Sequence, residues 1–259
     1  MQAPTESDAR RTQPPASPWA WRVRSRAWPA WLLACLWTTH AAAAVKFEDS
    51  MAQRMLACTP CHGEQGRAAP DGYYPRIAGK PAGYLFNQLR NFREGRRHYA
   101  LMAGLVDPLS DAYLLEIARY FSALELPYGP PAVMAAPAGR RGETLALKGD
   151  AALGIPACAS CHGSALTGVV PHVPGLLGLP RDYLNAQLGA WKTGHRRAQS
   201  PDCMAQVVRR LGDDDAAAIT LWLAAQALPG QSGPVGKAPQ RAPGSIACGS
   251  APELGGATP

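Results

Sequence analysis

Two short segments of this sequence carry residues that could hold a cofactor through covalent bonds. Residues 58–62 read Cys-Thr-Pro-Cys-His, and residues 158–162 read Cys-Ala-Ser-Cys-His. Two thiols one helical turn apart can each form a thioether with a vinyl group of haem, and the adjacent histidine can then bind the iron. The spacing therefore predicts two haem c groups with iron. The attachment residues would be Cys58, Cys61, Cys158 and Cys161, and the axial histidines would be His62 and His162.

A C-x-x-C pair also occurs in redox-active dithiols and in zinc sites. Neither of these sites needs a histidine directly after the second cysteine. Here the histidine is present in both segments, and a glycine follows it each time. Haem attachment is therefore the favoured interpretation, with dithiol exchange and zinc binding as the alternatives.

Each iron would need a second axial ligand, and two methionines are the candidates. Met102 and Met204 lie 40 and 42 residues after the histidine of their own motif, in the loop before the last helix expected in each repeat. A thioether ligand raises the reduction potential and leaves no open coordination position. Packing in the core is the alternative for either methionine. His98 and His195 are rival ligands, but we expect them to be solvated loop residues.

An axial histidine also needs an acceptor for its other ring nitrogen, which fixes the tautomer and tunes the basicity of the ring. Pro75 and Pro174 follow their histidines by 13 and 12 residues. We expect a proline carbonyl in each of these two places to support the histidine.

The elements that must position these residues also occur twice. At an offset of 99 residues, Tyr84 matches Tyr183 and Gln88 matches Gln187, and at an offset of 102 Met102 matches Met204. Each repeat is expected to hold three main helices, in an all-α fold. Their predicted ranges are 49–58, 82–92 and a helix capped by Ser110 in the first repeat, and 149–158, 181–191 and a helix capped near Asp213 in the second.

The domain organisation follows from these repeats and from composition. A stretch rich in Pro, Ala and Gly separates the repeats, and a similar stretch ends the chain. Such segments are expected to be linkers or flexible tails. We predict an export signal over residues 1–44, domains over 45–126 and 143–229, a Pro-rich linker over 127–142, and a flexible tail over 230–259.

The first 44 residues have the parts of a secretory signal peptide. Arginines precede an apolar run over residues 27–37, and small residues follow, with cleavage expected after Ala43 or Ala44. The alternatives are an uncleaved anchor and a lipoprotein cleavage box ending at Cys35. Export places the mature protein in the periplasm. The formal net charge of +7 is carried partly by this segment, and no aromatic-interleaved basic stretch points to nucleic acid.

The order of these motifs resembles a class I cytochrome c, and the tandem arrangement is similar to the dihaem cytochrome c4 family. The resemblance covers residues 46–228. It implies one covalent haem in each domain, His/Met ligation of both irons, and haem attachment outside the cytoplasm. It also implies an electron-transfer protein, not an enzyme, between respiratory-chain donors and a terminal oxidase or other acceptor.

The same resemblance leaves two alternative functions open. One is a cytochrome subunit of a periplasmic dehydrogenase complex, and the other is a dihaem enzyme similar to a peroxidase or a thiosulfate dehydrogenase. The expected partners are redox proteins, such as a membrane cytochrome complex, an oxidase or a dehydrogenase, with transient contact at the membrane surface. Arg93, Arg96, Arg97, Arg196 and Arg197 would steer an acidic partner, face solvent or bind haem propionates.

Two cysteines, Cys203 and Cys248, remain outside the motifs and the export signal. In an oxidising compartment such a pair predicts a disulfide, which would pin the tail to the loop of Met204. Two free thiols are one alternative. The other is a Cys203 thiolate on the iron, which would resemble thiosulfate-oxidising dihaem enzymes.

Overall fold

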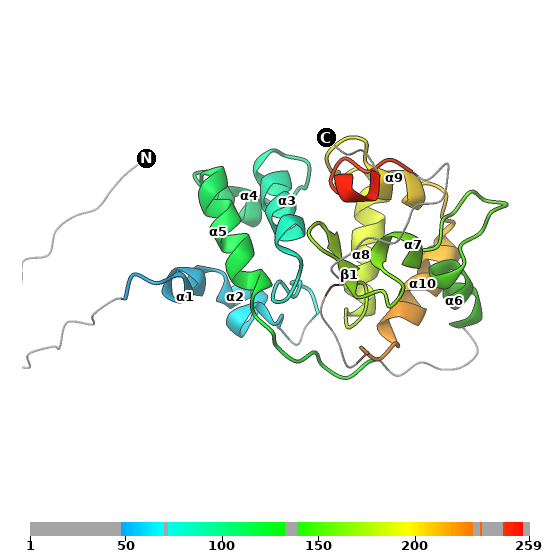
Figure 1. Ribbon diagram of the computed structural model, residues 1–259, viewed down its shortest axis with the longest axis horizontal. Helices are drawn as coiled ribbons and strands as arrows, with labels where there is room; N and C mark the ends of the chain where they lie inside the picture. Colours follow the sequence, from blue (N-terminus) through cyan, green and yellow to red (C-terminus); the bar gives the residue numbers. More distant parts are fainter. Residues whose placement is uncertain (1–47, 70–71, 133–138, 230–233, 235–245, 256–259) are drawn as a thin grey trace, which may run out of the picture. The chain divides into compact units, whose positions relative to one another are not determined.

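The computed structural model describes residues 48–69, 72–132, 139–229, 234 and 246–255. The expected export signal over residues 1–44, with Cys35, lies outside these ranges. Among the helices in these ranges, none has the length and apolar character needed to cross a lipid bilayer. We call residues 48–132 the first half, and residues 139–229 with 246–255 the second half (Figure 1).

The first half is built from short helices around one apolar core. Its two longest helices, α3 and α5, pack against each other (Figure 1). The core cluster uses buried side chains that include Met55, Leu85 and Leu114. In chain order the elements are α1 (Met51–Arg54), η2 (Met55–Ala57), α2 (Thr59–His62), η3 (Glu64–Gly66), α3 (Ala82–Arg93), α4 (Ala100–Val106) and α5 (Asp111–Ser122).

Helix α5 forms as its sequence predicts. The Ser110 hydroxyl accepts a hydrogen bond from the Tyr113 amide at 3.2 Å, which satisfies one free donor of the first turn. The apolar residues at helical spacing are all buried and face the core. They are Leu114, Ile117, Ala118 and Phe121.

The second half repeats this plan with one small addition. The all-α expectation is confirmed except for a two-stranded antiparallel ladder, in which Gly168 faces Pro174 and Val169 faces Val173. Helices α6, α8 and α10 enclose a second apolar core. The elements are α6 (Gly139–Leu147), α7 (Ala159–His162), β1 (Gly168–Val169), β2 (Val173–Pro174), α8 (Arg181–Lys192), α9 (Cys203–Val208), α10 (Asp213–Ala224) and η4 (Pro252–Gly255).

The helix predicted over residues 149–158 is wrong, because the first helix of this half is α6, which starts inside the expected linker over 127–142. Gly149 ends α6 with a φ of 73°, a conformation that favours glycine and stops a right-handed helix. Gly142 lets α6 approach α10 closely, since a Cβ there would lie 2.2 Å from the Ala218 carbonyl oxygen. The segment after Gly149 is a turn closed by a bridge between Asp150 and Ile155.

The start of α10 also differs from the prediction that Asp213 or a neighbouring side chain supplies its cap. Gly212 occupies the N-cap and has no side chain to accept a hydrogen bond. Asp213 is the first helical residue, and its carboxylate instead pairs with Lys192 of α8 at 2.5 Å.

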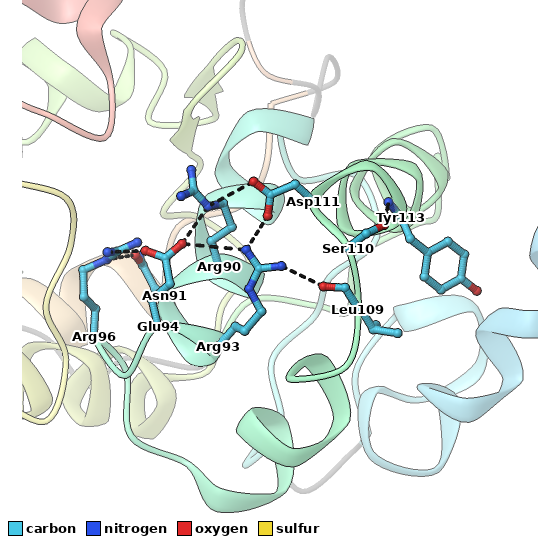
Figure 2. Close-up of polar contacts among 9 residues, drawn as sticks. All are labelled: Arg90, Asn91, Arg93, Glu94, Arg96, Leu109, Ser110, Asp111 and Tyr113. Atoms are coloured by element: carbon cyan, nitrogen blue, oxygen red, sulfur yellow. Dashed lines mark hydrogen bonds and ion pairs between the residues drawn. The ribbon is translucent and has the colours of Figure 1, made fainter.

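The corresponding ion pair of the first half ties the end of α3 to the start of α5 (Figure 2). Arg93 pairs with Asp111 and also donates to the Leu109 carbonyl at 2.7 Å. Arg90 donates to Glu94 at 2.8 Å, and Arg96 pairs with Glu94 at 2.5 Å. The two contacts of Arg93 hold the chain that follows α4, the helix that carries Met102.

The C-terminal segment, residues 246–255, is packed although the sequence predicts a flexible tail over 230–259. Cys248 forms a disulfide with Cys203 at the start of α9. Cys248, Ala251 and Leu254 are buried against Val169 and Val173, the residues of the ladder. An apolar contact surface and a covalent link therefore hold this segment on the second half.

The two halves meet along the segments that follow α3 and α8. Arg97 and Arg196 form an antiparallel bridge. The His98 amide donates to the His195 carbonyl at 3.0 Å, and the Arg197 amide donates to the Arg96 carbonyl at 2.7 Å. The bridge joins equivalent positions of the two repeats, which are 99 residues apart.

Candidate haem-binding sites

His62 is held at the end of helix α2 with one ring nitrogen already in use. Its side chain is buried, and Nδ1 lies 2.8 Å from the Pro75 carbonyl oxygen. A carbonyl oxygen only accepts, so the proton of the neutral ring is on Nδ1. The lone pair of Nε2 is therefore available to bind a metal.

His162 repeats this arrangement at the end of helix α7. It is also buried, and its Nδ1 lies 2.8 Å from the Pro174 carbonyl oxygen. Pro174 itself belongs to β2, so the ladder positions the acceptor. The two histidines thus have the same tautomer and the same kind of acceptor, in line with metal-bound histidines generally.

The surroundings of both histidines favour the uncharged ring. Burial lowers the pKa of His62, although the hydrogen bond to the Pro75 carbonyl opposes this effect. Burial likewise lowers the pKa of His162, against the opposing hydrogen bond to Pro174. A neutral imidazole is the form that binds metal ions.

The four motif cysteines are free thiols, each half-buried beside its histidine. Burial raises the pKa of the Cys58 thiol, and it raises that of Cys158 to about 11. Reactive dithiols have a lowered pKa, because the thiolate is the nucleophile. Cys58 and Cys158 are therefore poorly suited to disulfide exchange. Two thiols beside a histidine with a free Nε2 do fit the covalent attachment of haem c.

Met102 and Met204 lie in short helices rather than in the loops expected from the sequence. Met102 is in α4, half-buried against the same apolar cluster that contacts Cys58. Met204 is half-buried in α9, directly after Cys203. Both methionines keep their equivalent places between the middle and last helices of their halves.

The rival ligands are engaged or exposed. His98 and His195 are both exposed, and their ring centroids are 6.2 Å apart at the contact between the halves. His172, which has no counterpart in the first half, lies 2.9 Å from a carboxylate oxygen of Glu253. Cys203 is bonded to Cys248, so the structure contradicts a Cys203 thiolate ligand.

A polar cluster between the halves was not predicted from the sequence. Arg97 donates to the side-chain oxygens of Gln88 and Gln187, each at 2.9 Å. Arg196 donates to the same two oxygens, at 3.2 Å for Gln88 and 2.7 Å for Gln187. The recurrence of both the glutamine and the arginine at the offset of 99 residues was the sequence signal for a contact that the two halves share.

The cluster places two positive charges close together, and Arg97 is half-buried there. Arg196 is 6 % exposed. Burial, together with the charge of Arg196, lowers the pKa of Arg97 to about 10. These two side chains are therefore not free to steer a partner on the surface. Arg93 and Arg96 pair with Asp111 and Glu94.

Comparison with known proteins supports the interpretation of the two motifs. The Cytochrome c family matches residues 140–227. The chain is 44% identical over 173 residues to the thiosulfate dehydrogenase electron acceptor of Thiomonas intermedia (strain K12), a match that covers 66% of this chain and 79% of the relative. It is 32% identical over 190 residues to cytochrome c4 of Thiocapsa roseopersicina, covering 71% of this chain and 96% of the relative.

A solved structure shares the fold. The thiosulfate dehydrogenase from Marichromatium purpuratum superposes with a TM-score of 0.58 at 33% identity, over 66% of this chain and 36% of that chain. This chain therefore spans about a third of that longer protein. The architecture is two tandem class I cytochrome c domains, and the cofactors are two covalently bound haem c groups. The chain belongs to the cytochrome c4 family of dihaem electron-transfer cytochromes.

Proposed function

We propose that His62 and Met102 are the axial ligands of the first haem iron, and that His162 and Met204 are those of the second. The supporting observation is the repeated geometry. Each half holds a buried histidine whose Nδ1–H is bonded to a proline carbonyl, and one half-buried methionine at an equivalent position. Pro75 and Pro174 would then orient the two histidines.

If these four residues hold the two irons, neither iron would have a free position to bind a substrate. When bound, each haem supplies one-electron exchange between its ferric and ferrous states. The chain contributes attachment, axial ligands and exclusion of water. This supports a carrier of electrons rather than an enzyme.

We further propose that the donor is a thiosulfate-oxidising dehydrogenase and that the acceptor is a terminal oxidase or another respiratory protein. The donor is suggested by the 44% identical relative, which is named as the electron acceptor of such an enzyme. Joining two thiosulfate ions by an S–S bond releases two electrons, one for each haem. The proposed location is the periplasm, after export by residues 1–44, with the first domain over 45–126 and a second domain that begins with α6 at Gly139 and runs to about 229.

The ligand assignment is tested by substituting each methionine with leucine, which has a similar volume. Met102→Leu and Met204→Leu are each expected to remove half of the weak far-red absorption that sulfur-bound ferric haem shows. Met55→Leu is the matched control, because Met55 is buried in the core of the first half without an equivalent in the second. A full band in either ligand variant would refute that assignment.

The donor assignment is tested by mixing the ferric holoprotein with thiosulfate, with and without a thiosulfate dehydrogenase. We expect both haems to be reduced only when the dehydrogenase is present. Reduction by thiosulfate alone would instead favour an enzyme. Reduction that is no faster with the dehydrogenase than without it would refute this donor.

A further inference from the structure

Two arginines lie close together between the halves, with Arg196 buried and Arg97 half-buried, and neither has a carboxylate partner among the described residues. The partners of Arg97 and Arg196 in the described part of the chain are glutamine, tyrosine and backbone groups, and no carboxylate pairs with either. Two buried like charges without an anion are unfavourable. This place is therefore suited to an anionic group from outside the polypeptide, and haem carries propionate carboxylates.

Trp191 adds an unused hydrogen-bond donor beside this pair. Its indole Nε1 is buried and has no hydrogen-bond partner, the one such side-chain atom among the described residues. The Arg196 guanidinium lies over the Trp191 ring, with Cζ 3.8 Å from the ring centroid. The N–H lies in the plane of the ring, so stacking leaves it free. An unpaired buried donor costs free energy, which indicates that an acceptor is missing here.

The position of Trp191 on its helix points to the second haem. Leu184 and Trp191 are seven residues apart on α8 and therefore share one side of that helix. Leu184 belongs to the core cluster that contacts Cys158, an attachment residue of the second haem. The indole thus lies on the same side of α8 as Leu184.

The first half has no such donor. Phe92 occupies the equivalent position of α3, 99 residues earlier, and the Arg97 guanidinium lies over its ring at 4.4 Å. The stacking of arginine on an aromatic ring is therefore repeated, whereas the N–H is not. At this pair of equivalent positions, the second half therefore has an N–H donor and the first half does not.

We propose that the Trp191 indole N–H donates a hydrogen bond to a propionate carboxylate of the second haem, beside the Arg97–Arg196 pair. Because the bond favours the ionised carboxylate, it lowers the pKa of that propionate. It also offsets part of the negative charge near the iron, which favours the ferrous state and raises the potential of the second haem over that of the first. Trp191 is thus a residue that sets the difference between two similar haems.

The test compares Trp191→Phe with the wild-type holoprotein. We expect the midpoint potential of the second haem to fall. We also expect a rise of about one pH unit in the pH at which this potential begins to change, because one hydrogen bond to a charged group is worth about that much. Each haem is identified by nuclear Overhauser contacts from its thioether bridge protons to its own C-x-x-C-H residues. The titratable groups that surround this place are Arg97, Arg196, Tyr84, Tyr183, Lys80, His98 and His195.

Two controls separate the hydrogen bond from packing. Phe92→Leu removes an aromatic ring but no donor at the equivalent place, and Trp222→Phe removes an indole from α10, where it packs on the core. Both should leave the pH inflection of either haem in place. An equal shift in Phe92→Leu and Trp191→Phe, or a shift on the first haem in Trp191→Phe, would overturn the proposal.

A spectroscopic readout tests the hydrogen bond directly. The indole N–H band in the ultraviolet resonance Raman spectrum of the wild-type holoprotein should include one strongly hydrogen-bonded tryptophan, which is lost in Trp191→Phe. If no such band is present, the proposal is wrong. It depends on haem attachment but not on the methionine ligands or on the donor, so its failure would leave those assignments untouched.

Discussion

Arg76 shows how one buried side chain can fix the connection between the two halves. It is 7% exposed and donates to the Ala78, Pro127 and Leu126 carbonyls at 3.2, 3.0 and 2.5 Å. Its guanidinium also lies over the Tyr128 ring, with Cζ 3.8 Å from the centroid. The start of the connection is thus held on the first half by one residue.

Arg76→Met is therefore expected to lower the free energy of unfolding by about 2–4 kcal/mol, since carbonyls lose a charged donor while most of the side-chain volume is kept. Chemical denaturation followed by haem absorbance measures this. Arg67→Met is the control, because Arg67 is exposed and its nearest carboxylate contact, with Glu64, is 3.9 Å. That variant should change stability by no more than about 0.5 kcal/mol. Equal effects of the two substitutions would contradict this role for Arg76.

At the scale of single residues, the sequence identifies the side chains that would attach or ligate the haem. The cysteines, histidines and methionines are recognisable because their types and spacing are demanded by the cofactor. The roles of Arg97 and Arg196 are not, because the contacts that join the two halves link residues 90 and 108 positions apart. A local sequence pattern does not show which residues from distant parts of the chain meet. The sequence therefore leaves open whether an arginine is solvated or buried.

Among the elements, those with strong local signals were predicted well. The middle helices α3 and α8 extend one residue beyond their predicted ends, and α5 begins after Ser110 as expected. The two repeats differ over residues 149–158, where the second has no helix. Gly149, Gly154 and Pro156 interrupt that segment, and the helix that packs on α10 lies before them.

Helix α6 is joined to α10 by an ion-pair network that should respond to pH. Arg141 donates to Asp215 at 2.8 Å and to Asp150 at 2.9 Å. Its hydrogen bond to Asp215 lowers the pKa of that carboxyl, and its hydrogen bond to Asp150 does the same there. A lowered folded-state pKa means that the stabilisation is present above the unfolded pKa of about 4 and is lost as the pH falls through the folded value.

We therefore expect Arg141→Gln to lower the urea midpoint at pH 7 and to differ less from the wild type as the pH falls below about 4. Denaturation curves at several pH values check this. Lys148→Gln, an exposed change just after the same helix, should show no such trend. A difference between Arg141→Gln and wild type that stays constant with pH would contradict the ion-pair explanation.

For the whole molecule, the C-terminal segment links parts of both halves. Its disulfide reaches α9, and Glu253 contacts His172. The Asn87 amide of the first half donates to the Ser250 carbonyl at 2.9 Å. The paired cysteines predicted this disulfide, whereas composition alone suggested a flexible tail. The folded part of the tail thus depends on a long-range bond that composition does not reveal.

Replacing both Cys203 and Cys248 with serine should lower the free energy of unfolding by about 2–4 kcal/mol, since the disulfide restricts the unfolded chain. Denaturation under non-reducing conditions measures this. Glu253→Gln removes one partly exposed pair and should cost less than about 1 kcal/mol. If the serine variant is as stable as the wild type, the segment is held by its apolar contacts alone.

The exchange of arginine and glutamine between the halves has a consequence for how such a protein can arise. Because Arg97 and Arg196 bind the same two acceptors, the contact surface is self-complementary, as in a symmetric homodimer. An ancestral single-haem unit with this surface would already form a homodimer with a second copy of itself. Fusing the two units into one chain would make this association intramolecular, so that it would no longer depend on protein concentration. After such a fusion the two copies can change independently, so that one has tryptophan at position 191 while the other has phenylalanine at position 92.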